Sequence, residues 1–206
     1  METSGPPTRS PDAISTRSPR ATLIPESILH RFKKLLSQSW SPKTAYPGAV
    51  DELNWTAGDP CGQCGVSSVW LAEVLRYQYS ISSTFCLGSL IFYCRGAENF
   101  LDDHCWLEIN EETGEELILD LTCDQARGFD RPIIFDSKTD LDQERIYYRS
   151  RVRMDVSNLR KNPVWPRYQT LLVNLRQFAS NNHTSQEGPD RSRQFGAETL
   201  QLARAL

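Results

Sequence analysis

Residues 61–75, with the sequence CGQCGVSSVWLAEVL, constrain the fold of this chain more than any other segment. Two thiols and two glycines lead directly into apolar residues spaced at i, i+3 and i+4, as on the buried face of a helix. The sequence predicts a helix that starts at about Cys64, buries a broad face and ends near Tyr77. Unpaired amides and the positive end of the helix dipole stabilise an anion at such a start. Cys64 is therefore a candidate reactive thiolate.

Two predicted strands carry the groups that a reactive cysteine needs. His104 and Asp120 each lie in a short segment rich in large apolar residues, 102–109 and 117–122. The polar sequence NEETGEE between them suits a hairpin loop. A hairpin centred near Glu112 would place His104 directly across from Asp120, with the paired Cβ atoms ~5 Å apart. Through such a contact, a carboxylate orients a general base.

Length and charge narrow the class of protein. The chain has 206 residues, enough for one domain with a sizeable core. Its net charge of −3 gives no reason to expect a nucleic acid or an anionic membrane as partner. No apolar run is long enough to span a bilayer, and the N-terminus lacks the apolar core of a secretory signal. We therefore expect a cytoplasmic protein.

The six cysteines are expected to be free thiols, because a reducing compartment disfavours disulfides. Four of them lie in or beside apolar strand patterns, and we interpret these as small buried hydrophobic residues. They are Cys86, Cys94, Cys105 and Cys123.

Polar tails are predicted on both sides of one folded domain. Residues 1–25 contain five prolines among Ser, Thr and Arg, and we expect a disordered tail there. Residues 26–180 are expected to form the catalytic domain. Residues 181–206 form a second polar tail, in which 197–206 could be a short helix.

Within the domain, the order of elements is typical of an α+β fold, in which N-terminal helices and a C-terminal helix pack on a small antiparallel sheet. A first helix (26–40) and a long loop (41–60) precede the central helix, and a last helix follows at 163–180. Strands are expected at 80–94 with a bend at Gly88, 102–109, 117–122, 131–135 and 147–153, the last with a basic face of Arg149, Arg151 and Arg153. Loops or short helical turns are expected at 95–101, 123–128 and 137–145.

A cysteine at a helix start, a histidine on one strand and an aspartate on the next resemble the arrangement in papain-like cysteine hydrolases. Four segments are more closely similar to the YunG-like family, a small papain-like group. These are Ser39-Trp40-Ser41 with Thr44, Gly62-Gln63-Cys64, His104-Cys105-Trp106, and Asp120-Leu121-Thr122 with Gln125. The similarity covers roughly residues 28–125.

The resemblance implies a role for each matching residue. Cys64 would be the nucleophile, His104 the base and Asp120 the carboxylate that orients it. Gln63 and Gln125 would bind the oxyanion or the substrate. Papain-type peptidases carry their oxyanion-hole glutamine a few residues before the cysteine, whereas Gln63 is adjacent to Cys64. The backbone amide of Cys64 would then supply most of the oxyanion binding.

Other functions fit parts of the same pattern. The spacing Cys61-x-x-Cys64 before a helix is also found in redox proteins, but there it follows a buried strand. Cys61, Cys64 and His104, with Cys105 or Cys123, could instead hold a zinc ion. A papain-like scaffold that only binds a partner is the third alternative.

Together, most of these features predict a cysteine-dependent hydrolase or acyltransferase. It would act on an amide, isopeptide or thioester of a protein, a peptide or a small molecule, through an acyl-enzyme on Cys64. This chemistry needs no metal and no organic cofactor.

Overall fold

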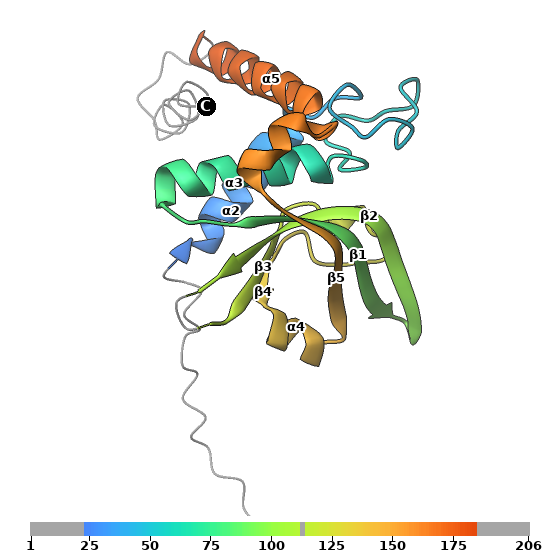
Figure 1. Ribbon diagram of the computed structural model, residues 1–206. Coiled ribbons are helices and arrows are strands. Elements are labelled where there is room, and N and C mark those ends of the chain that lie inside the picture. The colour runs from blue at the N-terminus through green and yellow to red at the C-terminus, as the bar shows by residue number, and fades with distance from the viewer. Residues whose placement is uncertain (1–22, 112–113, 185–206) are drawn as a thin grey trace, which may run out of the picture.

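The computed structural model describes residues 23–111 and 114–184, which form the α+β fold that the sequence predicts (Figure 1). The helix predicted at 197–206 and most of the predicted N-terminal tail lie outside the described residues. The packed domain begins earlier than residue 26, because Ile24 is 1% exposed and belongs to the core between helices and sheet. The predicted tail boundary at residue 25 is therefore too late.

One antiparallel sheet organises the molecule. Its strands are β1 (Thr84–Cys94), β2 (Ala97–Asn110), β3 (Glu116–Asp120), β4 (Ile134–Ser137) and β5 (Ile146–Asp155). They are arranged in the order β4-β3-β2-β1-β5, so that β2 lies in the centre. The central strand, β2, carries His104, and its neighbour β3 carries Asp120.

Helices cover both faces of the sheet (Figure 1). On one side lie α2 (Glu26–Ser37), α3 (Cys64–Tyr79) and α5 (Val164–Thr184), and on the other side lies the short α4 (Lys138–Gln143). Residues 64–75 of α3 are all buried, because α3 is enclosed by the sheet and the neighbouring helices. Among the described residues, no helix is both long and apolar enough to cross a membrane.

The prediction of a loop at 95–101 is wrong. Cys94 pairs with Ala97, so β1 and β2 are joined by a two-residue hairpin turn. Both turn residues have positive φ, 52° at Arg95 and 80° at Gly96, as the favoured turns of such hairpins require. The strand continues through the segment expected to be loop, and β2 is therefore longer than predicted.

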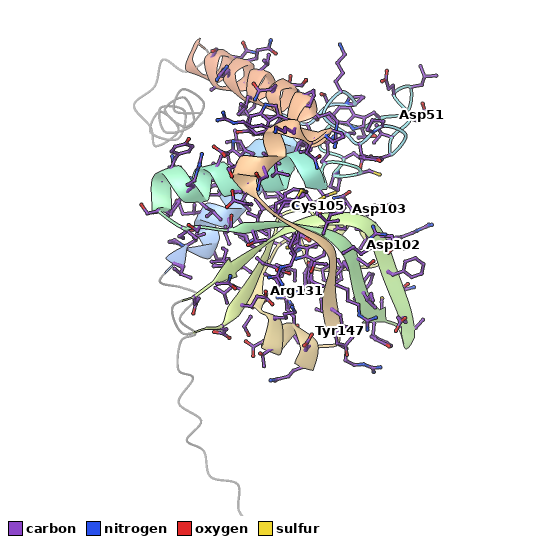
Figure 2. All side chains as sticks on the ribbon, in the orientation of Figure 1. Asp51, Asp102, Asp103, Cys105, Arg131 and Tyr147 are labelled. Atoms are coloured by element: carbon purple, nitrogen blue, oxygen red, sulfur yellow. The ribbon has the colours of Figure 1, made fainter. Side chains whose placement is uncertain are left out.

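A bulge interrupts the β1–β2 ladder just before His104. The register shifts between Gly88 and Leu90, and Asp103 on the facing strand has a φ of 53°. A Cβ on Gly88 would lie 2.0 Å from the carbonyl oxygen of Arg149, so the predicted bend depends on glycine there. Bulges of this kind redirect the side chains that follow them. Figure 2 shows Asp103 and its neighbours where the β-ribbon passes below the helices.

Alternate residues of β2 belong to two separate cores. Cys105, Leu107 and Ile109 pack towards the helices, whereas Trp106 packs with Tyr148 in the core on the other face. Both faces of this part of the strand are therefore buried, which explains its continuous apolar character. His104 has the same parity as Trp106 and lies at the edge of the second core.

The remaining predicted elements are present with shifted ends. The strand expected at 131–135 is β4, the segment 137–145 contains α4, and a 3₁₀ turn forms at Cys123–Gln125.

The predicted basic face of β5 is largely neutralised by acidic side chains. Arg151 pairs with Asp103, and Arg153 pairs with Glu108 and Glu116.

Candidate active site

Cys64 is the first residue of α3, as the sequence predicts, and the turn before it is fixed from two sides. The carbonyl of Gly62 accepts a hydrogen bond from the amide of Tyr46 at 2.8 Å. The amide of Gly62 donates to Oε1 of Gln125 at 2.9 Å. A Cβ on Gly62 would lie 2.6 Å from Cβ of Ala49, so only glycine fits this turn. The thiol is thereby held at the head of the helix.

The Gln63 side chain does not point into the site. It is fully buried, its Oε1 accepts from the hydroxyl of Thr44 at 2.8 Å, and its Nε2 donates to the carbonyl of Ser41 at 3.0 Å. The carboxamide is thus committed to the loop before α3, and the predicted oxyanion role of this side chain is wrong. Gln63 instead ties that loop to the start of the helix.

Gln125 reaches the cleft next to Cys64 but is also largely committed. Its Oε1 accepts from the amide of Gly62, and its Nε2 donates to the carbonyl of Thr122 at 3.1 Å. One N–H of the carboxamide therefore remains for a substrate. The structure places Gln125 at the site as predicted, with a supporting contact to the turn.

His104 and Asp120 meet, although not as directly paired residues. Leu107 pairs with Leu119 and Asn110 with Glu116, which centres the hairpin on residue 113. In this register Asp120 falls opposite Trp106, and His104 is its diagonal neighbour on the same face. Nε2 of His104 lies 2.5 Å from Oδ2 of Asp120, and both side chains are buried.

The Asp120 carboxylate is saturated with hydrogen bonds. Besides His104, Oδ2 accepts from the hydroxyl of Tyr148 at 3.0 Å. Oδ1 accepts from the amide of Thr122 at 2.7 Å and from its hydroxyl at 3.0 Å. Burial alone would raise the pKa of Asp120, but the charge of His104 and these donors lower it below its usual value. Asp120 is therefore an anion that can orient His104 and stabilise its protonated form.

Tyr148 was not identified from the sequence as part of the site. It lies on β5, which β2 and β1 separate from the strand of Asp120 in the sheet, and it is 4% exposed. Its hydroxyl nevertheless reaches the carboxylate at 3.0 Å. A tyrosine within a strand pattern gives no local signal of such a contact.

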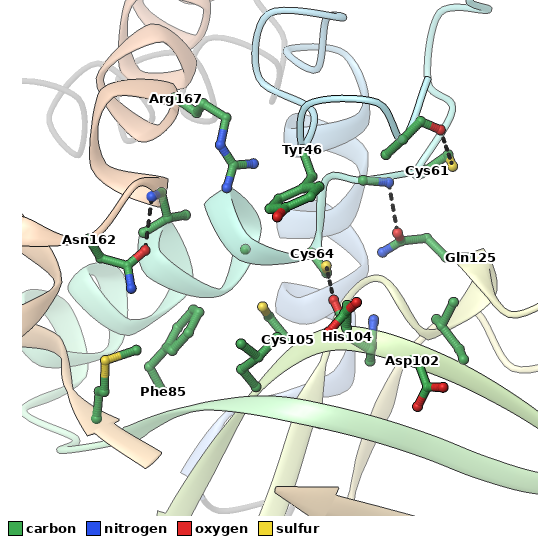
Figure 3. Close-up of a pocket in the computed structure, with 18 residues that line it drawn as sticks. Tyr46, Cys61, Cys64, Phe85, Asp102, His104, Cys105, Gln125, Asn162 and Arg167 are labelled. Atoms are coloured by element: carbon green, nitrogen blue, oxygen red, sulfur yellow. Dashed lines mark hydrogen bonds between the residues drawn. The ribbon is translucent and has the colours of Figure 1, made fainter. Parts of the chain in front are cut away.

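The other ring nitrogen of His104 faces the thiol. Nδ1 is buried and has no hydrogen-bond partner of standard geometry in the part of the chain that the structure describes. Sγ of Cys64 lies 4.0 Å from the carbonyl oxygen of Asp103, the residue before His104 (Figure 3). The imidazole and the thiol are close enough to perturb each other's pKa by hydrogen bonding and by charge. The three predicted catalytic residues are thus brought together in one place.

The charges at the site favour a thiolate beside an imidazolium. Burial opposes protonation of His104, but Asp120, with a smaller contribution from Cys64, raises its pKa to about 10. The pKa of Cys64 is lowered well below its usual value, chiefly by a hydrogen bond from the thiol of Cys105 and also by His104, which together outweigh burial. These are the properties of an activated nucleophile.

Cys105 has a larger part in the site than the sequence suggested. It is buried, as predicted, but its side chain points towards the helices and lines the cleft beside Cys64. The hydrogen bond to Cys64 and burial raise its pKa well above the usual value. Cys105 therefore stays a thiol and donates to the thiolate. Of the other predicted buried cysteines, Cys86 and Cys123 are buried and Cys94 is half-buried.

The redox and zinc alternatives find little support in the geometry. All six cysteines are free, and the exposed Cys61 donates from Sγ to the carbonyl of Ala49 at 3.1 Å. Burial and the charge of Asp59 raise the pKa of Cys61, the opposite of what an attacking redox thiol needs. Across residues 23–111 and 114–184, no group of three or more His, Cys, Asp or Glu side chains could hold a metal.

A cleft of about 350 Å³ opens over the thiol (Figure 3). The loop before α3 supplies Tyr46, the sheet supplies Phe85 and Met154, and α5 supplies Arg167. Most of its wall is apolar, so a substrate there is partly shielded from water. Arg167 was not identified from the sequence, because it lies far from the other site residues along the chain.

No family model matches this chain, and neither a curated protein nor a solved structure does. The similarity to the YunG-like family therefore stays a prediction based on the four segments named above.

Proposed function

We propose that this protein is a cysteine-dependent hydrolase or acyltransferase that acts on an amide, isopeptide or thioester carbonyl. One observation carries the proposal. His104 is held by Asp120 at 2.5 Å through Nε2, and its Nδ1 is buried without a partner beside the thiol of Cys64. A histidine placed in this way can take up a proton from the thiol and return it to a leaving group.

The reaction follows from these positions. The Cys64 thiolate attacks the carbonyl carbon and forms a C–S bond. Backbone N–H groups at the start of α3 would bind the developing oxyanion, because the first N–H groups of a helix lack acceptors within it. The imidazolium of His104 donates its proton to the leaving nitrogen or sulfur as the bond to carbon breaks. An acyl-enzyme on Cys64 remains.

The second half restores the thiolate. His104, now neutral, takes a proton from water or an amine, which attacks the acyl carbon and displaces the Cys64 sulfur. Asp120 stays ionised throughout and stabilises the imidazolium whenever it forms. The cleft has room for a peptide segment or a small amide over the thiol.

Electrophile labelling with site mapping by mass spectrometry tests the proposal. An iodoacetamide-type probe should modify Cys64 ahead of the other five cysteines, and His104→Ala should remove this preference. On any amide or isopeptide substrate found in a screen, Cys64→Ala should abolish turnover, whereas Cys61→Ala should leave it intact. Even labelling of all six cysteines would favour a scaffold that only binds. Equal loss in both cysteine variants would favour redox or zinc chemistry.

A further inference from the structure

The cleft contains a cation that the reaction described above does not use. Among the described residues that line the cleft, Arg167 is the one arginine or lysine. It is the fourth residue of α5 and is partly buried. Figure 3 shows its guanidinium directed into the cleft, beside Tyr46 and on the same side as Cys64.

Arg167 has little to neutralise it. Nη1 donates to the carbonyl of Thr44 at a long 3.4 Å, and the guanidinium carbon lies 5.3 Å from the centre of the Tyr46 ring. No carboxylate of the described residues forms an ion pair with it. The two acids that line the cleft are engaged elsewhere, Asp102 with the hydroxyl of Ser89 and Asp103 with Arg151. Apart from the contact to Thr44, the N–H donors of Arg167 have no hydrogen-bond acceptor among the described residues.

The cation lies beside the first turn of α3, which carries the reacting sulfur. Gly65 follows Cys64, and a Cβ on it would be 3.8 Å from both Nη2 of Arg167 and Sγ of Cys105. Because Gly65 has no side chain, the space between the guanidinium and the thiols stays open. Burial lowers the pKa of Arg167, and the negative charge of the Cys64 thiolate partly offsets this effect.

We propose that Arg167 is a specificity-determining residue that binds a carboxylate of the substrate, and that the preferred substrates carry this carboxylate within a few bonds of the scissile carbonyl. The inference rests on the proposed function, since it names the substrate class of the same site. A carboxylate matches the planar guanidinium through two parallel hydrogen bonds. It would also compensate a partly buried charge that the described residues leave unpaired. The apolar wall strengthens such a contact by excluding water.

Two pairs of alkylating reagents test this without a known substrate. N-iodoacetylglycine and N-iodoacetylglycinamide differ only in a terminal carboxylate. The α-amides of N-iodoacetylglutamate and N-iodoacetylglutamine differ only in a side-chain carboxylate. Second-order rate constants at Cys64 are measured for all four by mass spectrometry, and the carboxylate-to-amide ratio within each pair is compared between variants. Ratios cancel differences in thiol reactivity and in the folded fraction.

In the unmodified protein, at least one pair should show a preference of about tenfold for the carboxylate, as expected for one charge-assisted contact. The pair that shows it identifies the carboxylate as terminal or side-chain. Arg167→Gln should bring the ratio close to one, and Arg167→Lys should keep part of it. Arg149→Gln is the matched control, because it removes the same charge from β5 outside the cleft and should keep the preference.

A preference that survives Arg167→Gln, or a faster reaction with the amide in both pairs, would overturn the inference while leaving the nucleophile assignment standing. Failure of all four reagents to label Cys64 ahead of the other cysteines would overturn the proposed function, and the inference with it.

Discussion

The hydroxyl of Tyr148 donates to the same carboxylate oxygen of Asp120 that contacts His104, at 3.0 Å and 2.5 Å respectively. Asp120 is therefore positioned by β5, the strand at the opposite edge of the sheet, as well as by its own hairpin. All three side chains are buried, so this hydrogen bond acts where water does not compete. Tyr148 is a positioning residue for the proposed His104–Asp120 pair.

Tyr148→Phe should weaken the pair without disrupting the fold. Losing this donor leaves the Asp120 carboxylate free to shift relative to His104. We expect a stability loss of about 1 kcal/mol, together with a lower alkaline limit for turnover, because a displaced carboxylate stabilises the His104 imidazolium less. Urea unfolding and a pH profile measure the two effects. Tyr147→Phe is the control, because Tyr147 faces away from Asp120, and a matching shift in that variant would contradict the positioning role.

The pH dependence of alkylation reports directly on the thiolate. Because the pKa of Cys64 is lowered well below its usual value, its alkylation rate should stay nearly constant as pH falls from 9 to 7. The pKa of Cys61 is raised, so its rate should fall about tenfold per pH unit over the same range. Both sites are followed in one sample by peptide mass spectrometry. Parallel decline at both cysteines would show that Cys64 is an ordinary thiol.

Cys105→Ala tests the thiol that hydrogen bonds to Cys64. Removing this donor should raise the pKa of Cys64, so that the fall in its alkylation rate begins at a higher pH. His104 remains in place, so labelling should slow at neutral pH and recover in alkali. Cys94→Ala, which removes a half-buried thiol outside the cleft, should leave the profile unchanged. An unchanged profile in Cys105→Ala would mean that His104 alone stabilises the thiolate.

The contact between His104 and Asp120 could be predicted from the sequence because it depends only on which face of the sheet each side chain occupies. Side chains alternate along a strand, so a register error of two residues returns both groups to the same face. The predicted pairing was wrong by that amount, with the hairpin centred on residue 113, yet the two side chains still meet. An error of one residue would have separated them across the sheet.

Contacts between distant segments could not be predicted in this way. Tyr148 and Arg167 reach the site through the packing of β5 and α5, and no local pattern around either residue marks it. The turn at Arg95 and Gly96 was missed because arginine is an unusual residue at positive φ. The existence and type of most helices and strands, by contrast, followed from periodicity within single segments, although several ends are shifted.

The direction of the Gln63 side chain depends on the same kind of distant contact, and it leads to the sharpest stability prediction. Gln63→Ala removes two buried hydrogen bonds, to the Thr44 hydroxyl and to the Ser41 carbonyl, and leaves a cavity where the carboxamide lay. We expect a loss of about 2–3 kcal/mol in the free energy of unfolding. Gln38→Ala, at the exposed end of α2, should change the free energy of unfolding little.

Urea unfolding measures the stability of both variants, and Cys64 labelling is compared under conditions where each variant is folded. A stable Gln63→Ala variant with strongly reduced turnover would restore a direct oxyanion role for this side chain. A destabilised variant that keeps its reactivity when folded would establish Gln63 as the tie between the loop and the helix that carries the thiol.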